Sequence, residues 1–154
     1  MRILIVEDSA SDMATAVEII RTAGHEAIEA TNALEGVNEL QPRVGSPKID
    51  GVITDLFMPD GAPDLDELSG IGVADQPRGL SVALRAEQLG IPFIICTAGY
   101  HHGTKYNWIC QLGRQRSWPE MVDSATDRDD LFTTEGPSKD WQKALDILTK
   151  RLRS

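Results

Sequence analysis

The chain has 154 residues, which at about 150 residues per domain predicts a single domain. It carries 24 acidic and 15 basic residues, for a formal net charge of -9. This balance argues against free-standing nucleic-acid binding, which needs clustered Lys and Arg, and against a polybasic membrane anchor. The two cysteines, Cys96 and Cys110, are too few for a disulfide-built secreted fold. No run approaches the ~20 apolar residues of a membrane span, and the first apolar run is too short for a signal peptide, so we expect a cytoplasmic protein.

The negative charge is concentrated in two segments. Residues 60–77 hold five acids and no Lys or Arg, and residues 120–135 hold six acids and one base, Arg128. Packed elements rarely concentrate one sign of charge, so both segments are predicted to be solvated loops. We expect them to form an acidic rim that favours a basic partner.

The first half of the chain predicts two strand–helix units. The apolar run 3–6 predicts a strand buried on both faces. Ser9 or Ser11 can cap the next helix, which has Met13, Val17 and Ile20 on one face and Gly24 as its stop. Residues 25–30 predict a second strand. Asn32 can cap a second helix, which runs through Leu34, Val37 and Leu40 and ends at Pro42.

The second half continues the alternation. Residues 49–54 predict a third strand, 78–89 a helix, 91–96 a fourth strand and 104–115 a further helix. Residues 121–125 predict a weak fifth strand. A C-terminal helix is expected over 138–153, with its apolar face marked by Trp141, Leu145, Leu148 and Leu152.

Five strand–helix alternations predict an α/β fold, a parallel sheet with helices on both faces. Five such units need about 120 residues at ordinary element and loop lengths, which leaves roughly thirty to spare. We place the surplus in an inserted acidic loop, 61–77, and in an expanded irregular region, 100–135. The organisation expected is therefore one domain over 1–154.

The candidate site follows from the strand ends. In an open α/β sheet, ligands bind beyond the carboxyl ends of the strands. The first strand ends at Glu7 and Asp8, the third at Asp55 and the fourth at Thr97. Three carboxylates held together repel one another, and a cation would offset that cost. An all-oxygen set suits Mg²⁺ better than zinc.

These strand ends carry a family resemblance. The segments IVEDS, ITDLFMPDG and IICTAG together resemble the receiver domain of two-component response regulators, over roughly residues 1–60 and 78–100. The resemblance implies a flavodoxin-like, doubly wound, five-stranded parallel sheet with strand order 2-1-3-4-5. It also implies a signalling module that is no enzyme beyond its own phosphorylation and dephosphorylation. Because the sequence ends one helix after the fifth strand, we expect this module to be stand-alone.

The resemblance implies a role for each strand-end residue. Asp55 would be the phosphoacceptor, and Asp8, Asp55 and the backbone carbonyl of Phe57 would ligate Mg²⁺. Glu7 would hold the metal through water, and Thr97 would bind a phosphoryl oxygen and act in switching. The implied partners are a sensor histidine kinase or histidine phosphotransfer protein and an output protein reached by docking, without nucleic acid or membrane.

One expected residue has no counterpart at its usual place, since the family carries a Lys-Pro just after the fifth strand. Here no lysine lies between Lys105 and Lys139. Lys105 and Arg128 are the candidate substitutes for the cation. The missing lysine leaves an alternative open, a pseudo-receiver that binds partners without switching by phosphorylation. A third class, an aspartate-nucleophile phosphatase, wants a second acid two residues after the nucleophile, where this chain has Phe57.

Overall fold

The computed structural model describes residues 1–42, 44–58, 76–98, 107–123 and 139–153. Its sheet has five strands in the order β2-β1-β3-β4-β5, and every neighbouring pair is parallel. The strands are β1 (Arg2–Val6), β2 (Glu26–Ala30), β3 (Gly51–Thr54), β4 (Phe93–Thr97) and β5 (Val122–Asp123). The flavodoxin-like order implied by the resemblance is therefore confirmed.

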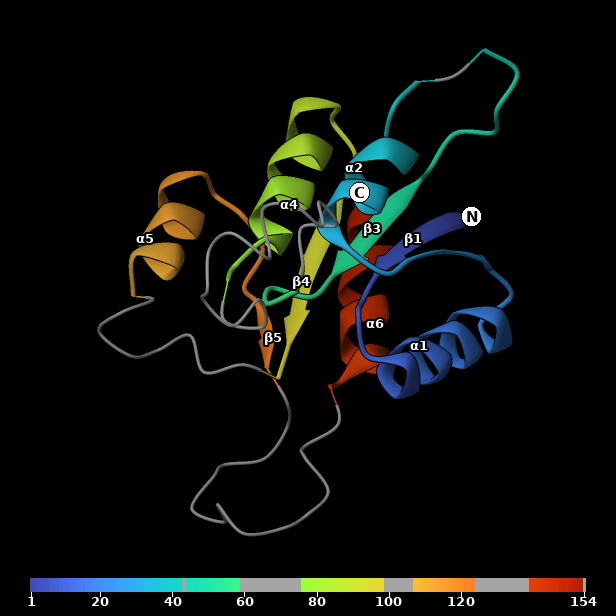
Figure 1. Cartoon of the computed structure of the whole chain (residues 1–154), viewed down its shortest axis with the longest axis horizontal. Helices are drawn as coiled ribbons and strands as arrows, with labels where there is room; N and C mark the ends of the chain where they lie inside the picture. The colour runs from blue at the N-terminus through green and yellow to red at the C-terminus, as the bar shows by residue number, and fades with distance from the viewer. Residues whose placement is uncertain (43, 59–75, 99–106, 124–138, 154) are drawn as a thin grey trace, which may run out of the picture.

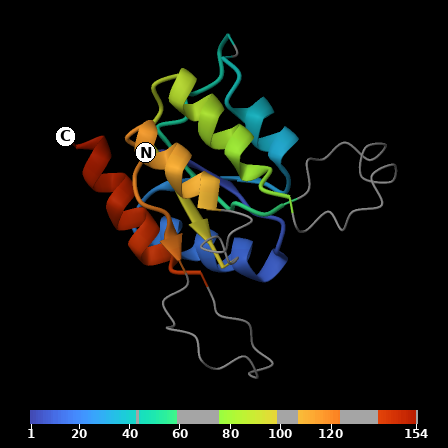
Figure 2. The ribbon, with the colours of Figure 1, turned by 90° about the vertical axis from the view of Figure 1, so that its left-hand side faces the viewer.

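Helices cover both faces of the sheet (Figures 1 and 2). One face packs against α1 (Ala10–Thr22) and α6 (Trp141–Leu152). The other packs against α2 (Ala33–Glu39), α4 (Gly79–Gln88) and α5 (Asn107–Gln115). In β1, Ile3 and Ile5 belong to the first core, and Leu4 and Val6 to the second. Alternate side chains of a strand point to opposite faces, so a strand buried on both faces reads as an unbroken apolar run.

Local capping chemistry sets the helix ends much as predicted. Ser9, rather than Ser11, caps α1, and its side chain accepts a hydrogen bond from the Asp12 amide. Asn32 caps α2 and accepts from the Glu35 amide at 2.9 Å. Gly24 follows the end of α1 with φ +79°, a conformation that costs glycine little.

Two expectations about the helices need correction. Leu34 belongs to the apolar series Leu34, Val37 and Leu40 that predicts the second helix, but it is 47% exposed, and Ala33 and Gly36 face the core instead. A Cβ on Gly36 would lie 2.8 Å from a Val6 methyl, so the close approach of α2 to β1 selects small residues there. The last helix begins at Trp141 rather than at residue 138, because Asp140 is its N-cap.

The inserted segment after β3 leaves the sheet intact. Met58 and Pro77 form a parallel β-bridge, so the described residues on either side of 59–75 meet. The Gly79 amide then donates to the Leu56 carbonyl at 3.0 Å, which starts α4 directly beside the end of β3. Most of the inserted acidic loop and of the proposed acidic rim lies outside the described residues.

Among the helices that the structure describes, none is long and apolar enough to cross a membrane.

Candidate functional site

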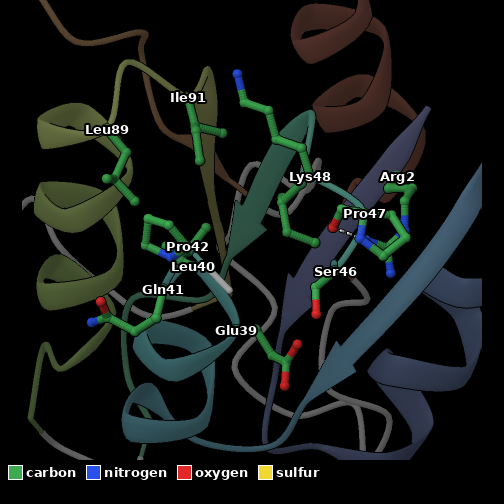
Figure 3. Close-up of a pocket in the computed structure, with 11 residues that line it drawn as sticks. Arg2, Glu39, Leu40, Gln41, Pro42, Ser46, Pro47, Lys48, Leu89 and Ile91 are labelled. Carbon is green, nitrogen blue, oxygen red and sulfur yellow. Dashed lines mark hydrogen bonds between the residues drawn. The ribbon is translucent and has the colours of Figure 1, made fainter. Parts of the chain in front are cut away.

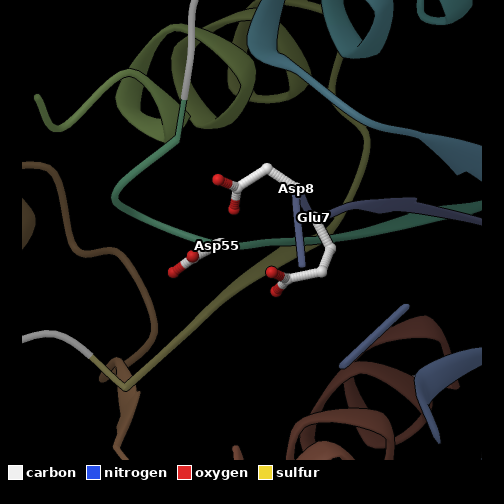
Figure 4. Close-up of side chains that lie close together, drawn as sticks. All are labelled: Glu7, Asp8 and Asp55. Atoms are coloured by element: carbon white, nitrogen blue, oxygen red, sulfur yellow. The ribbon is translucent and has the colours of Figure 1, made fainter. Parts of the chain in front are cut away.

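The predicted strand-end residues converge at the carboxyl edge of the sheet. Glu7 and Asp8 follow β1, Asp55 follows β3, and Thr97 is the last residue of β4. The Asp55 amide donates to the Val6 carbonyl at 2.8 Å, which continues the β1–β3 ladder beyond the strands. One carboxylate oxygen from each of Glu7, Asp8 and Asp55 lies within 4.8 Å of the others (Figure 4).

Lys139 contacts two of these three carboxylates. Its Nζ is 2.8 Å from Asp55 Oδ2 and also forms an ion pair with Glu7 Oε2. Only 4% of its side chain is exposed. The interpretation that the site lacks a lysine is therefore wrong. Residues 124–138 separate Lys139 from β5 along the chain, and the tertiary structure brings it back to the site.

One feature of the sequence does mark Lys139. In the family, the lysine comes before the last helix, and Lys139 stands immediately before Asp140, the N-cap of α6. Counting from the fifth strand missed it, whereas counting back from the last helix would have found it. The two substitutes suggested instead, Lys105 and Arg128, lie outside the described residues.

Each oxygen of the Asp55 carboxylate has a donor. Oδ1 accepts from the Leu56 amide at 2.6 Å and Oδ2 accepts from Lys139, and the Thr97 hydroxyl also hydrogen-bonds this side chain. Asp55 is 5% exposed, and this burial raises its pKa despite the opposing effects of Lys139 and the hydrogen bonds. Thr97 is itself buried. The strand ends thus bring Thr97 and Asp55 together, as their convergence at one edge of the sheet predicts.

Glu7 and Asp8 are neighbours with opposite surroundings. Glu7 is fully buried, and its Oε1 accepts from the Ser9 amide at 2.9 Å. Burial, with a contribution from the Asp55 charge, raises the pKa of Glu7 to about 7, although Lys139 acts in the other direction. Asp8 is exposed. The cluster therefore offers one solvent-facing carboxylate and two buried ones.

Lys139 stays protonated in this environment. Desolvation favours the neutral amine, but the charges of Asp55 and Glu7 outweigh it, so the net effect is a raised Lys139 pKa. Two carboxylates and one ammonium leave one negative charge, and Asp8 adds a second at the solvent side. A divalent cation would balance these charges.

The donor set fits Mg²⁺. All the side-chain ligands are carboxylate oxygens, which this hard ion prefers, and exposed Asp8 leaves room for the waters it retains. Phe57, whose carbonyl was the fourth expected ligand, is half-buried two residues after Asp55. Glu7 and Asp55 both contact Lys139 and are buried, whereas Asp8 is exposed, so Asp8 is the carboxylate best placed to reach an ion from the solvent side.

A second concavity, of about 390 Å³, lies at the opposite edge of the sheet (Figure 3). Its lining includes Leu40, Pro42 and Ile91 together with Arg2, whose guanidinium donates to Glu26 Oε2 at 3.0 Å and to the Pro47 carbonyl. The rest of the lining mixes aliphatic side chains with Glu39, Gln41, Ser46 and Lys48, and among the described residues it brings no cluster of carboxylates together as the opposite edge does.

Comparison with known proteins identifies the fold. No family model and no curated protein matches the chain. Among solved structures, a CheY-like response regulator receiver domain protein from Methanospirillum hungatei superimposes with a TM-score of 0.63 at 14% identity, covering 99% of this chain and 93% of that one. The non-phosphorylated HemR receiver domain of Leptospira biflexa gives 0.55 at 22% identity, with 99% and 94% covered. TrrA of Thermotoga maritima, solved with Mg²⁺ and BeF, gives 0.54 at 19% identity, with 98% and 97% covered. The chain therefore has the fold of response regulator receiver domains.

Proposed function

We propose that this protein is a receiver that accepts a phosphoryl group on Asp55 in a Mg²⁺-dependent reaction of two-component signalling. The observation that carries the proposal is the cluster of Asp55 with Glu7, Asp8, Lys139 and Thr97 at the carboxyl edge of a receiver-fold sheet. The unit spans 1–154 as one domain, with 61–77 as an inserted acidic loop and 100–135 as an expanded region that contains α5 and β5.

Phosphoryl transfer to an aspartate is mainly a problem of positioning and charge neutralisation. A carboxylate oxygen of Asp55 would attack phosphorus and form a new P–O bond. The bond from phosphorus to the donor breaks, and its electron pair leaves with the donor, an imidazole nitrogen in the case of a phosphohistidine. Mg²⁺ would neutralise charge on the phosphoryl oxygens. Asp8, Asp55 and the Phe57 carbonyl would hold the ion, and Glu7 would hold it through water.

Two groups of the chain would bind the transferred phosphoryl group. Lys139 Nζ is 2.8 Å from Asp55 Oδ2, close enough to contact an oxygen of a phosphoryl group placed there. The Thr97 hydroxyl, which hydrogen-bonds Asp55, would donate to another. The new group brings about -1.5 to -2 charges, which would draw both donors toward it.

The presence of Lys139 also bears on the pseudo-receiver alternative. That alternative rested on the absence of a cation next to Asp55. With the ammonium of Lys139 in contact with the carboxylate, the reason for expecting a module that does not switch is removed. We therefore infer phosphorylation-dependent output by docking to another protein, with a histidine kinase or histidine phosphotransfer protein as the source of the phosphoryl group.

The test uses the full chain with Mg²⁺ and either acetyl phosphate or beryllofluoride. The wild type should gain one phosphoryl group by intact-protein mass spectrometry and show bound beryllofluoride by fluorine NMR. Asp55→Asn should do neither. Asp50→Asn is the matched control, because Asp50 lies at the other end of β3, where its side chain accepts from the Arg2 amide. A folded wild type that neither phosphorylates nor binds beryllofluoride would refute the proposal.

A further inference from the structure

Lys139 lies immediately before α6, so the start of this helix positions its side chain in the site. The Trp141 amide donates to the Lys139 carbonyl at 3.0 Å, and the Asp140 side chain caps the helix by accepting from the Lys143 amide at 3.0 Å. Lys139 is thus tied to the first turn of a helix whose inner face is core. The position of the ammonium therefore depends on how the start of α6 is anchored.

Trp141 is the first residue of α6 and the largest side chain at this end of the helix. It is 2% exposed and belongs to the core that α1 and α6 form with the sheet. Its ring centroid lies 5.7 Å from Lys139 Nζ. That distance is within the range of a cation–π interaction, which is stronger where the cation is desolvated, as Lys139 is here.

The unpaired indole N–H of Trp141 suggests why a tryptophan occupies this position. Although buried, it has no hydrogen-bond acceptor among the described residues. An unpaired buried donor is unfavourable, and Leu or Phe would fill the core without one. The property that a tryptophan supplies best in this place is the electron-rich face of its ring toward an ammonium.

We propose that Trp141 is a positioning residue, whose ring holds the Lys139 ammonium between Glu7 and Asp55. The Asp140 cap and the Trp141 anchor together place the cation from its C-terminal side, so that its place does not depend on the length of chain between β5 and Lys139. The expected effect of Trp141 on phosphoryl binding rests on the proposed function. The contact between Trp141 and Lys139 is independent of that function.

The test is a double-mutant cycle with Trp141→Leu, Lys139→Ala and the double variant, measured in two ways. In the presence of Mg²⁺, calorimetry gives the affinity for beryllofluoride. We expect Trp141→Leu to lower that affinity about fivefold in the wild-type background and to have no further effect in Lys139→Ala. Trp141→Phe, which keeps a ring, should lose less. Leu145→Ala, another buried substitution in α6, should leave the affinity unchanged.

Urea unfolding of the same four proteins gives the second readout, and it needs no ligand. In this measurement, Trp141→Leu should lower the free energy of unfolding by less in the Lys139→Ala background than in the wild type. Equal costs in both backgrounds, or an affinity loss that persists without Lys139, would overturn the proposal and leave Trp141 as core packing. If wild type binds no beryllofluoride, the proposed function fails, and the unfolding cycle still decides whether Trp141 holds Lys139. If Lys139→Ala binds too weakly to measure, the unfolding cycle decides as well.

Discussion

Replacing Lys139 by methionine removes the one cation that contacts both buried carboxylates among the described residues. Glu7 is fully buried and Asp55 is 5% exposed, so neither can recover the lost interaction from water. Removing one partner of a buried ion pair costs about 3–5 kcal/mol, because an uncompensated charge is left behind. Methionine keeps most of the apolar stem of lysine, so little of the loss would come from packing.

The cost should depend on pH, with a sign that follows from the carboxylates. Burial raises the pKa of both Glu7 and Asp55 in the folded state, and removing the ammonium raises them further. The folded variant then binds more protons than the unfolded chain, so its stability falls as pH rises through the folded pKa values. At pH 5.5, Glu7, with its pKa of about 7, is already mostly protonated in the wild type. We therefore expect the full loss at pH 8.5 and a clearly smaller one at pH 5.5.

Urea unfolding of both proteins at the two pH values, without and with Mg²⁺, measures this. Added Mg²⁺ should restore part of the stability, because its charge takes the place of the ammonium. Glu7→Gln combined with Lys139→Met is the control, since removing one of the unpaired charges should recover part of the loss. A loss below about 1 kcal/mol at pH 8.5, or an equal loss at both pH values, would refute the reasoning.

Two further predictions concern the same edge of the sheet. Glu7 must be deprotonated to contribute to cation binding, and its pKa is about 7. The Mg²⁺ affinity measured by calorimetry should therefore rise about tenfold between pH 6 and pH 8. In Glu7→Gln, the affinity should depend less on pH. A flat wild-type profile would contradict the assignment of Glu7. A Cβ on Gly79 would lie 1.8 Å from the Asp55 carbonyl oxygen, so Gly79→Ala should destabilise the fold by about 1–3 kcal/mol and weaken beryllofluoride binding. Glycine-to-alanine in an unobstructed helix is stabilising by about 0.5–1 kcal/mol, so a more stable Gly79→Ala variant would show that α4 does not need this close approach.

Much of the fold was readable from local pattern. The apolar runs predicted the strands, because a strand buried on both faces has no polar position. Ser9 and Asn32 marked helix starts because their side chains accept from orphan amides of the first turn. The apolar residues of α2 do not by themselves give its core-facing side, since Leu34 is exposed and Gly36, which carries no hydrophobic signal, packs against Val6.

The candidate site divides in the same way. Glu7, Asp8, Asp55 and Thr97 were found from sequence alone, because parallel strands bring their carboxyl ends to one edge whatever lies between them. Lys139 and its contact with Trp141 were not, since its place before the last helix singles it out in the sequence but a charged side chain there has no local mark of burial. Only the tertiary structure, by anchoring the start of α6 in the core beside β1 and β3, decided that this ammonium stands between two buried carboxylates.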